Sequence, residues 1–412
     1  MARTMALDDA AGVTVISHFE ASVRGHPYGR LARAPVTSSQ SYVGEQMRPI
    51  ERDELGPLAT GAWILGTGGG GSPYLSYLNM CKLYADGSQV NLMDPADLAD
   101  DALVAVVSNM GAPLVGQERL SDPAFAAKPV RMMEDYLGRR FSAVMSVEIG
   151  GGNAFQPLLV AAMTGLPVVD ADAMGRAYPE AQMTSFAIAD LPMFPLTLAD
   201  IRDNEVIVAR AASWKWMERI SRKVCTEVGS IAATCKAPRS GAEVKAHGIL
   251  YTTTQAIALG REVRRARHAH EDPVAAILNA AKGKLLFRGK IVDVQRRATE
   301  GFLRGTARME GIDDDRGVRF EVAFQNEYAV GWRDGRVVVT TPDLICLLDS
   351  VSGEAIGTES LRYGQRVSVI ALPAPAILRT PKGIAHVGPR AFGHDTDYVT
   401  VFDDAEATEQ RS

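Results

Sequence analysis

The sequence lacks the features that are typical of several classes of protein. Its 412 residues include only four cysteines and seven histidines, and neither a CxxC nor an HExxH motif is present. Such sparse cysteines, in a chain long enough to bury a large core, indicate free thiols rather than a disulfide framework. The 44 basic residues are balanced by 49 acidic ones, so no excess of positive charge attracts nucleic acid. No apolar run reaches the roughly 18 residues that a membrane span requires. We therefore expect a cytoplasmic protein without nucleic-acid or membrane partners.

The rest of the composition is that of a globular protein. Hydrophobic residues make up 46% of the chain and charged residues 23%, which excludes a disordered chain, a coiled coil and a collagen-like fibre. At roughly 150 residues per domain, the length predicts two or three domains. Residues 1–46 have no sustained hydrophobic period, so we expect a disordered N-terminal extension. An α/β domain is expected over residues 47–210 and a β-rich domain over residues 211–405.

In the first domain, short apolar runs alternate with helical patterns. Strands are expected at residues 62–65, 90–93, 103–108, 143–147, 166–169 and 206–209, and helices at 51–60, 73–85, 129–137 and 155–164. Continuous apolar strands that alternate with helices favour a parallel sheet covered on both faces.

After residue 211 the pattern changes. Helices are expected at residues 214–224 and within 241–281, followed by short strands at 285–287, 289–294, 318–324, 337–340 and 367–371. Asp334-Gly335 lies between two apolar runs and predicts a hairpin turn. The fold class expected is α/β: an N-terminal parallel-sheet domain with glycine-rich loops, and a C-terminal β-rich α+β domain.

The first glycine cluster, residues 66–71, fits a dinucleotide-binding pattern. It reads G-x-G-x-x-G, follows an expected strand and precedes an expected helix, and Asp94 lies near the end of the next strand. No Walker-A lysine is present. Four consecutive glycines also match the pattern by chance, so three interpretations remain open: a nucleotide site, a site for an anionic or polar small ligand, and a structural turn.

Two further loops are expected at the same edge of the sheet. Residues 150–153 form a second glycine cluster, and residues 170–180 carry acids and an arginine beyond another strand. The carboxyl ends of parallel strands converge on the crevice where α/β sheets bind ligands. One interpretation of Asp170, Asp172 and Arg176 is a structural ion pair with helix capping. The other is that Arg176 holds an anionic group while an acid activates water.

The C-terminal segment offers a third group of candidates. His394, Asp395 and Asp397 are spaced so that they are able to ligate a metal such as zinc or to position a base. A solvated turn is the alternative. Arg304, flanked by Gly301 and Gly305, is a candidate clamp for a carboxylate.

Several of these motifs, in this order, resemble those of the S-methyl thiohydantoin desulfurase family, a bacterial group of hydantoinase- and oxoprolinase-like proteins. The resemblance spans residues 47–402 and is carried by residues 61–74, 109–113, 151–153, 169–180, 289–293, 301–305 and 388–393. It implies an N-terminal α/β domain and a β-rich C-terminal domain, in agreement with the patterns above. It also implies hydrolysis of the C–S bond of an S-methyl thiohydantoin, a small heterocycle, which releases methanethiol and leaves a hydantoin.

This chemistry requires a base for the attacking water and donors for the charge that develops on the ring. We predict Asp172 or Glu180 as the base, Arg176 as the anion anchor, and Asn153 as a donor. His394 is a further catalytic candidate. The substrate-binding candidates are Gly68, Gly69, Gly70, Gly71, Asn109, Gly152 and Arg304. A divalent metal such as zinc is a possible cofactor, although the chain shows no clear ligand motif.

Two other functions remain open at this stage. One is a dinucleotide-dependent oxidoreductase that uses the 66–71 loop. The other is a non-catalytic protein that binds a small ligand. A homo-oligomer is compatible with each of the three functions.

Overall fold

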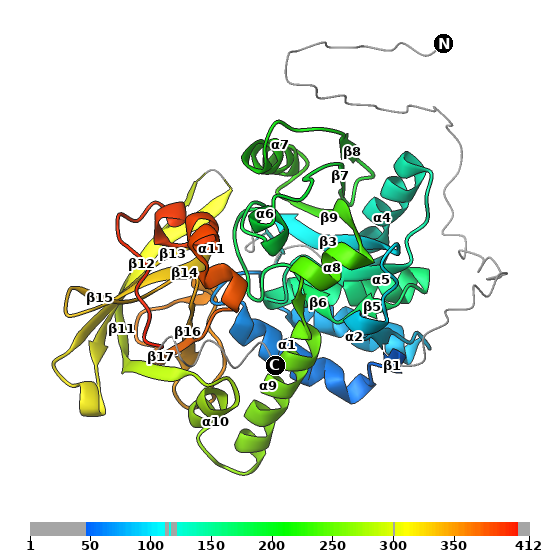
Figure 1. Ribbon diagram of the computed structural model, residues 1–412. Coiled ribbons are helices and arrows are strands. Elements are labelled where there is room, and N and C mark those ends of the chain that lie inside the picture. The colour runs from blue at the N-terminus through cyan, green and yellow to red at the C-terminus, as the bar shows by residue number, and fades with distance from the viewer. Residues whose placement is uncertain (1–46, 112–114, 117–121, 300, 403–412) are drawn as a thin grey trace.

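The computed structural model describes residues 47–111, 115–116, 122–299 and 301–402 (Figure 1). The disorder predicted for residues 1–46 concerns a segment outside these residues. Two large sheets, one of eight strands and one of seven, lie beside each other (Figure 1). Among the described helices, none is long and apolar enough to cross a membrane.

The eight-stranded sheet has a parallel centre and antiparallel edges. Its order is β1-β2-β5-β4-β3-β9-β7-β8, and β2, β5, β4 and β3 run parallel. The strands are β1 (Met47–Pro49), β2 (Asn91–Met93), β3 (Leu103–Gly111), β4 (Ala143–Ser146), β5 (Val168–Val169), β7 (Leu196–Ala199), β8 (Glu205–Val208) and β9 (Ile231–Ser240). The predicted parallel sheet is confirmed, with antiparallel strands added at both sides.

Both faces of the central strand β3 are buried. Ala105 and Val107 belong to one hydrophobic core, while Val104 and Val106 belong to another. Because successive side chains of a strand point to opposite faces, this division places a separate core on each side of the sheet. The helices of this half are α2 (Tyr74–Ala85), α4 (Pro123–Leu137), α5 (Gln156–Thr164), α6 (Ser185–Ile188), α7 (Trp214–Glu227) and α8 (Gly241–His247).

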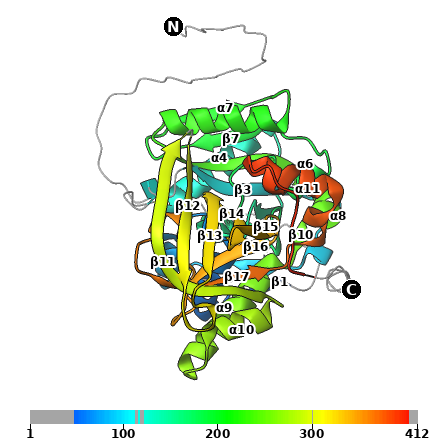
Figure 2. The same ribbon diagram turned by 90° about the vertical axis from the view of Figure 1, so that its left-hand side faces the viewer.

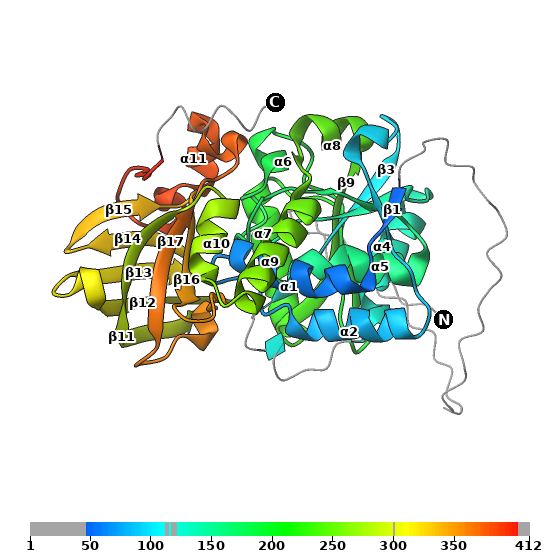
Figure 3. The ribbon, with the colours of Figure 1, turned by 90° about the horizontal axis from the view of Figure 1, so that it is seen from below.

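One predicted strand is wrong. Residues 62–65 form the end of helix α1 (Leu55–Leu65), which lies along α9 (Thr252–His268; Figure 3). A Cβ on Gly61 would lie 1.9 Å from the Ala256 carbonyl oxygen, and one on Gly260 would lie 1.9 Å from the Pro57 carbonyl oxygen. The two helix backbones therefore touch at their glycines, and α1 is buried deeply enough for its apolar run to resemble a buried strand.

The seven-stranded sheet is antiparallel throughout and faces the viewer in Figure 2. Its order is β15-β14-β13-β12-β11-β17-β16. The strands are β11 (Lys284–Thr299), β12 (Phe302–Gly311), β13 (Arg319–Gln325), β14 (Glu327–Arg333), β15 (Arg336–Thr340), β16 (Leu344–Asp349) and β17 (Arg366–Leu372). The hairpin predicted at Asp334-Gly335 joins β14 to β15. The predicted β-rich second half is therefore confirmed.

The two halves of the chain share one core. Strand β9 lies in the first sheet between β3 and β7, although it follows residue 211. Helices α9 and α10 (Pro273–Ala280) lie at the lower edge of the junction between the two halves (Figure 1), and Val274 and Ile277 of α10 join a core that also contains Leu344 and Ile370 of the second sheet. The carboxyl ends of the parallel strands are thereby held against the second sheet.

The remaining elements are short. A two-stranded sheet pairs β6 (Ala171–Asp172) with β10 (Ile249–Leu250). Helix α11 (Pro381–Val387) lies near the C-terminus, and the 3-10 helices are η1 (Arg52–Glu54), η2 (Pro95–Asp97), η3 (Gly151–Phe155), η4 (Asp313–Asp315), η5 (Thr358–Ser360), η6 (Ala376–Arg379) and η7 (Pro389–Phe392). All four cysteines are free, and three are buried, as the composition predicts.

Candidate active site

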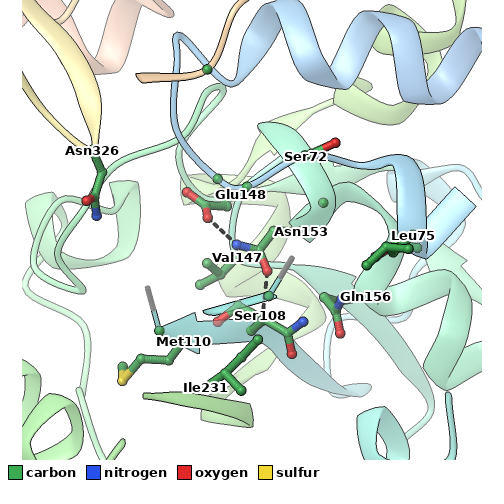
Figure 4. Close-up of a pocket in the computed structure, with 18 of the residues that line it drawn as sticks. Ser72, Leu75, Ser108, Met110, Val147, Glu148, Asn153, Gln156, Ile231 and Asn326 are labelled. Carbon is green, nitrogen blue, oxygen red and sulfur yellow. Dashed lines mark hydrogen bonds between the residues drawn. The ribbon is translucent and has the colours of Figure 1, made fainter. Parts of the chain in front are cut away.

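A cavity of about 760 Å³ lies where the carboxyl ends of β3 and β4 meet the second sheet. Its lining includes Ser108 and Asn109 of β3, Glu148 just after β4, and Asn326 from the turn between β13 and β14. Figure 4 shows Glu148 and Asn153 near the centre, with Asn326 reaching in from the other sheet. The cavity therefore occupies the crevice that the glycine-rich loops predict for an α/β sheet.

Glu148 is a buried carboxyl held by two donors. The Asn153 side-chain amide donates to Oε1, and the Tyr178 backbone N–H donates to Oε2 at 3.0 Å. Burial raises the pKa of Glu148 to about 7, while these hydrogen bonds and the positive charges of Lys236 and Arg176 oppose the shift. A carboxyl whose pKa lies near neutrality, in a cavity, is a candidate general base.

Asn153 positions this carboxyl. Its Oδ1 accepts the Asn109 backbone N–H at 2.7 Å, while its amide nitrogen donates to Glu148. The side chain thus ties the end of β3 to the carboxyl that follows β4. Asn153 and Asn109 both line the cavity, but the Asn153 amide that the sequence predicts as a substrate donor already binds Glu148.

The glycines of the 66–71 loop let protein segments approach one another. Gly70 has a φ of +71°, and a Cβ there would lie 2.4 Å from the Gly150 carbonyl oxygen. The Gly152 N–H donates to the carbonyl oxygens of Gly70 at 3.1 Å and Gly71 at 2.9 Å. Gly70, Gly71 and Gly152 line the cavity. The predicted meeting of the first two loops is therefore observed.

Gly68 and Gly69 make room for the second sheet instead. A Cβ on Gly68 would lie 2.5 Å from the Tyr328 ring, and one on Gly69 would lie 2.0 Å from Oε1 of Glu327. Neither glycine is among the described residues that line the cavity. The absence of a side chain at both positions serves the junction between the two sheets.

The structural context expected of a dinucleotide fingerprint is not present. The 66–71 loop follows helix α1 and not a strand, so the strand–loop–helix unit is broken. Asp94 lines a different pocket, of about 420 Å³, together with Asp170 and Tyr251. Both observations that favoured nucleotide binding are thereby removed.

Asp172 and Arg176 are fully buried and are not among the described residues that line the cavity. Oδ2 of Asp172 accepts the backbone N–H groups of Ile149 at 2.7 Å, Gly175 at 2.8 Å and Met174 at 3.3 Å. Burial raises its pKa to about 7. Its contacts are those of a carboxyl that shapes a loop.

Every nitrogen of the Arg176 guanidinium donates to the protein. Its hydrogen-bond acceptors are Thr67 Oγ1 at 2.6 Å and the carbonyl oxygens of Ala177, Tyr328, Pro342 and Asp343 at 2.9–3.3 Å. Apart from the neighbouring Ala177, these acceptors belong to the glycine loop and to the second half of the chain. Arg176 therefore joins the two halves, and its fork is occupied without a ligand.

Comparison with known protein families identifies the family to which the chain belongs. Two family models match the chain in order: the S-Me-THD-like N-terminal domain over residues 53–210 and the S-Me-THD-like C-terminal domain over residues 212–401. The chain belongs to the S-Me-THD-like family. This result confirms the resemblance to the S-methyl thiohydantoin desulfurases.

A solved structure of a protein from Chromobacterium violaceum is also similar to the chain. The TM-score is 0.72 and the sequence identity 25%, and the match covers 86% of this chain and 100% of that chain. No curated protein matches. The overall arrangement of elements is thus shared with a solved protein.

Several of the charged side chains that line the cavity were not predicted from the sequence. Lys236 projects from β9, and burial lowers its pKa. Glu218 and Arg222 of α7 form a buried ion pair at the wall. Glu327 stands at the start of β14. Of the predicted acids Glu180 does line the cavity, where the Gln182 amide donates to its Oε2 at 2.5 Å and the Gln325 amide to its Oε1 at 3.3 Å.

The C-terminal candidates lie elsewhere. His394 packs against the Trp332 ring with the ring centres 6.0 Å apart, and burial lowers its pKa. Asp397 pairs with Arg390 at 2.8 Å, and Asp395 lies 3.7 Å from the same arginine. Arg304 is exposed on β12. None of these residues belongs to the described lining of the cavity.

The donor set does not fit a zinc ion. Within residues 47–111, 115–116, 122–299 and 301–402, no three His, Cys, Asp or Glu side chains are grouped so that they could hold a metal. Zinc sites in proteins use three or four such ligands. We therefore derive no catalytic step through a metal.

Proposed function

We propose that the protein is a hydrolase of hydantoin-like heterocycles that cleaves the C–S bond of an S-methyl thiohydantoin, releasing methanethiol. Its membership of the S-Me-THD-like family supports this proposal. The observation that carries it is Glu148, a buried and doubly hydrogen-bonded carboxyl in a cavity of about 760 Å³. Cavities of roughly 300–1,000 Å³ are typical of small-molecule sites.

In this proposal Glu148 is the general base. The ring carbon that carries sulfur is amidine-like and electrophilic, and water becomes a better nucleophile as a base removes its proton. With a pKa of about 7, Glu148 is substantially ionised near neutral pH and is a stronger base than an exposed glutamate. Asn153 and the Tyr178 N–H fix its position, and each carboxylate oxygen has a second lone pair for a water molecule.

The cavity also supplies positive charge. Lys236 lies close enough to Glu148 to oppose its pKa shift, and both residues line the cavity. As water adds, negative charge develops on the ring and is then carried away by the leaving sulfur. A cation held in a buried site stabilises such charge more strongly than it does in water. We assign this electrostatic role to Lys236.

The proposal is tested by methanethiol release from an S-methyl thiohydantoin. Glu148→Gln keeps the shape of the side chain but removes its basicity, so we expect kcat to fall by about a hundredfold or more. Glu354→Gln is the control, because Glu354 is a half-exposed carboxylate at the cavity rim that pairs with Arg267 at 2.8 Å. It should retain wild-type turnover.

Three results would change the assignment. If Glu180→Gln abolishes turnover and Glu148→Gln does not, the base is Glu180. Saturable binding of the heterocycle by the wild-type protein without any product would indicate a ligand-binding protein. If the protein hydrolyses the hydantoin ring without releasing methanethiol, it is a hydrolase, but the C–S bond is not the bond that it cleaves.

A further inference from the structure

A second carboxyl, Glu327, lines the same cavity in a different environment. Its side chain is 2% exposed, and its Oε2 is buried without a hydrogen-bond partner among the described residues. Buried polar atoms are nearly always paired. Because Glu327 lines the cavity, a bound ligand is able to supply the partner that this carboxyl lacks.

The opposite glycine loop leaves room for this carboxyl. A Cβ on Gly69 would lie 2.0 Å from Oε1 of Glu327, so any other residue at position 69 would displace the carboxyl. Unlike its neighbours in the loop, Gly69 does not need a positive φ. The absence of a side chain at position 69 thus serves the placement of Glu327.

The charges around Glu327 favour its neutral form. Burial raises its pKa well above the usual value, and the negative charge of Glu148 acts in the same direction. The positive charge of Arg176 and hydrogen bonds from the backbone N–H groups of Gly70 and Glu327 itself oppose the shift. A neutral carboxyl carries a proton that it is able to donate. Two carboxyls whose environments separate their pKa values are the usual arrangement of an acid and a base.

We propose that Glu327 is the general acid of this site and protonates the imine-type nitrogen of an S-alkylated heterocycle while Glu148 deprotonates the attacking water. The inference rests on the proposed function, because it uses the same reaction. It adds a catalytic residue and specifies the ligand as one with an unprotonated ring nitrogen beside the sulfur-bearing carbon.

The protons balance over two steps. In the first, the water oxygen bonds to the ring carbon and a water proton passes to Glu148. The C=N electron pair moves to nitrogen, which takes the proton of Glu327. In the second, the C–S bond breaks with its electron pair on sulfur, which takes the proton from Glu148. The hydroxyl proton returns to Glu327 as the C=O bond forms. Both carboxyls end in their starting states, and the products are a hydantoin and methanethiol.

This arrangement distinguishes substrate from product. The S-methyl compound presents a nitrogen lone pair to the Glu327 proton, whereas the hydantoin presents an N–H at that position. Two donors that face each other without an acceptor cost free energy. A thiohydantoin without the methyl group also carries N–H groups in its thione form. We therefore expect it to bind more weakly and to react slowly.

The test compares pH–rate profiles for methanethiol release by the full-length protein. For the wild type, a plot of kcat against pH should be bell-shaped, with an acid limb from ionisation of Glu148 and an alkaline limb from ionisation of Glu327. Glu327→Gln keeps a donor for the ring nitrogen but cannot transfer a proton. We expect kcat to fall about a hundredfold, the alkaline limb to disappear and KM to change little.

Glu359→Gln is the matched control. Glu359 is also a buried glutamate whose pKa is raised by burial, and both of its side-chain oxygens are buried without a hydrogen-bond partner among the described residues. It does not belong to the described lining of the cavity. The variant should therefore keep both limbs and the wild-type kcat. Gly69→Ala, which displaces the Glu327 carboxyl without replacing it, should reproduce the loss seen in Glu327→Gln.

The outcomes separate the two proposals. A folded Glu327→Gln protein that keeps its kcat and alkaline limb overturns the role of Glu327, while Glu148→Gln still tests the hydrolase. A raised KM with unchanged kcat also overturns it, because Glu327 would then only bind the ligand. If the wild type releases no methanethiol, both proposals fail. If Glu327→Gln does not fold, Gly69→Ala decides: a retained alkaline limb overturns the proposal, and its loss supports it.

Discussion

Two buried carboxyl groups from each half of the molecule are held in different ways. In the first half, Asp172 accepts several backbone N–H groups and Glu148 accepts one donor on each oxygen. In the second half, Glu327 and Glu359 have buried oxygens without hydrogen-bond partners among the described residues. Hydrogen bonds stabilise the ionised form, whereas burial without them stabilises the neutral form. Of the two carboxyls at the cavity, the hydrogen bonds of Glu148 thus favour its ionised form, and the burial of Glu327 favours its neutral form.

The substitution with the largest expected effect disrupts the contacts between the two halves. Arg176→Met removes a buried guanidinium and leaves its hydrogen-bond acceptors unpaired, so we expect the free energy of unfolding to fall by about 4 kcal/mol. Urea unfolding measures this loss. Arg304→Met, on an exposed face of β12, should change it by no more than about 0.5 kcal/mol. A small loss for Arg176→Met together with weakened substrate binding would instead favour the anion anchor predicted from the sequence.

The next effect is a dependence of stability on pH. The carboxyl of Glu148 ionises near pH 4.5 when unfolded and near pH 7 when folded. Because the unfolded chain releases this proton first, rising pH destabilises the native state across that window. The unfolding free energy of the wild type should therefore fall by roughly 3 kcal/mol relative to Glu148→Gln between pH 4 and pH 8. Parallel pH curves would show that Glu148 keeps an ordinary pKa.

The substitution with the smallest expected effect tests whether Asp172 shapes a loop or acts in catalysis. Asp172→Asn replaces one acceptor oxygen by an amide without a partner, which should lower the unfolding free energy by about 2 kcal/mol. The folded protein should keep kcat within about threefold, since Asp172 is not among the described lining residues. Thermal unfolding and methanethiol release measure the two quantities. A hundredfold fall in kcat would return Asp172 to the role of base.

Much of the fold was predictable because its elements are locally distinct. Strand β3 is apolar on both faces, and the turn at Asp334-Gly335 has the residues that a hairpin requires. Helix α1 was not predictable beyond its first turns. Its apolar end is buried by α9, which lies about 200 residues later in the chain, and burial on all sides hides the helical period.

The candidate site was predictable only in part. The two glycine clusters and Asn109 do meet at one cavity. Asn109 and the 150–153 cluster meet because the ends of neighbouring parallel strands converge, whereas the 66–71 loop reaches the cavity from helix α1. Glu148 had a usable signal, since it follows a buried strand directly and precedes a glycine cluster. Lys236 and Glu327 had none. Each lies in a strand, and only the position of that strand brings its side chain to the cavity.

The sequence by itself determined the alternation of strands and helices, the glycine loops and the family, because these depend on local pattern and residue order. Only the tertiary structure decided which charged side chains line the cavity. It buried Arg176 and Asp172 with their polar atoms hydrogen-bonded to the protein, and it brought Glu327 to the cavity that Glu148 lines. Burial and pairing set the protonation of a carboxyl, and both depend on segments far apart in the chain.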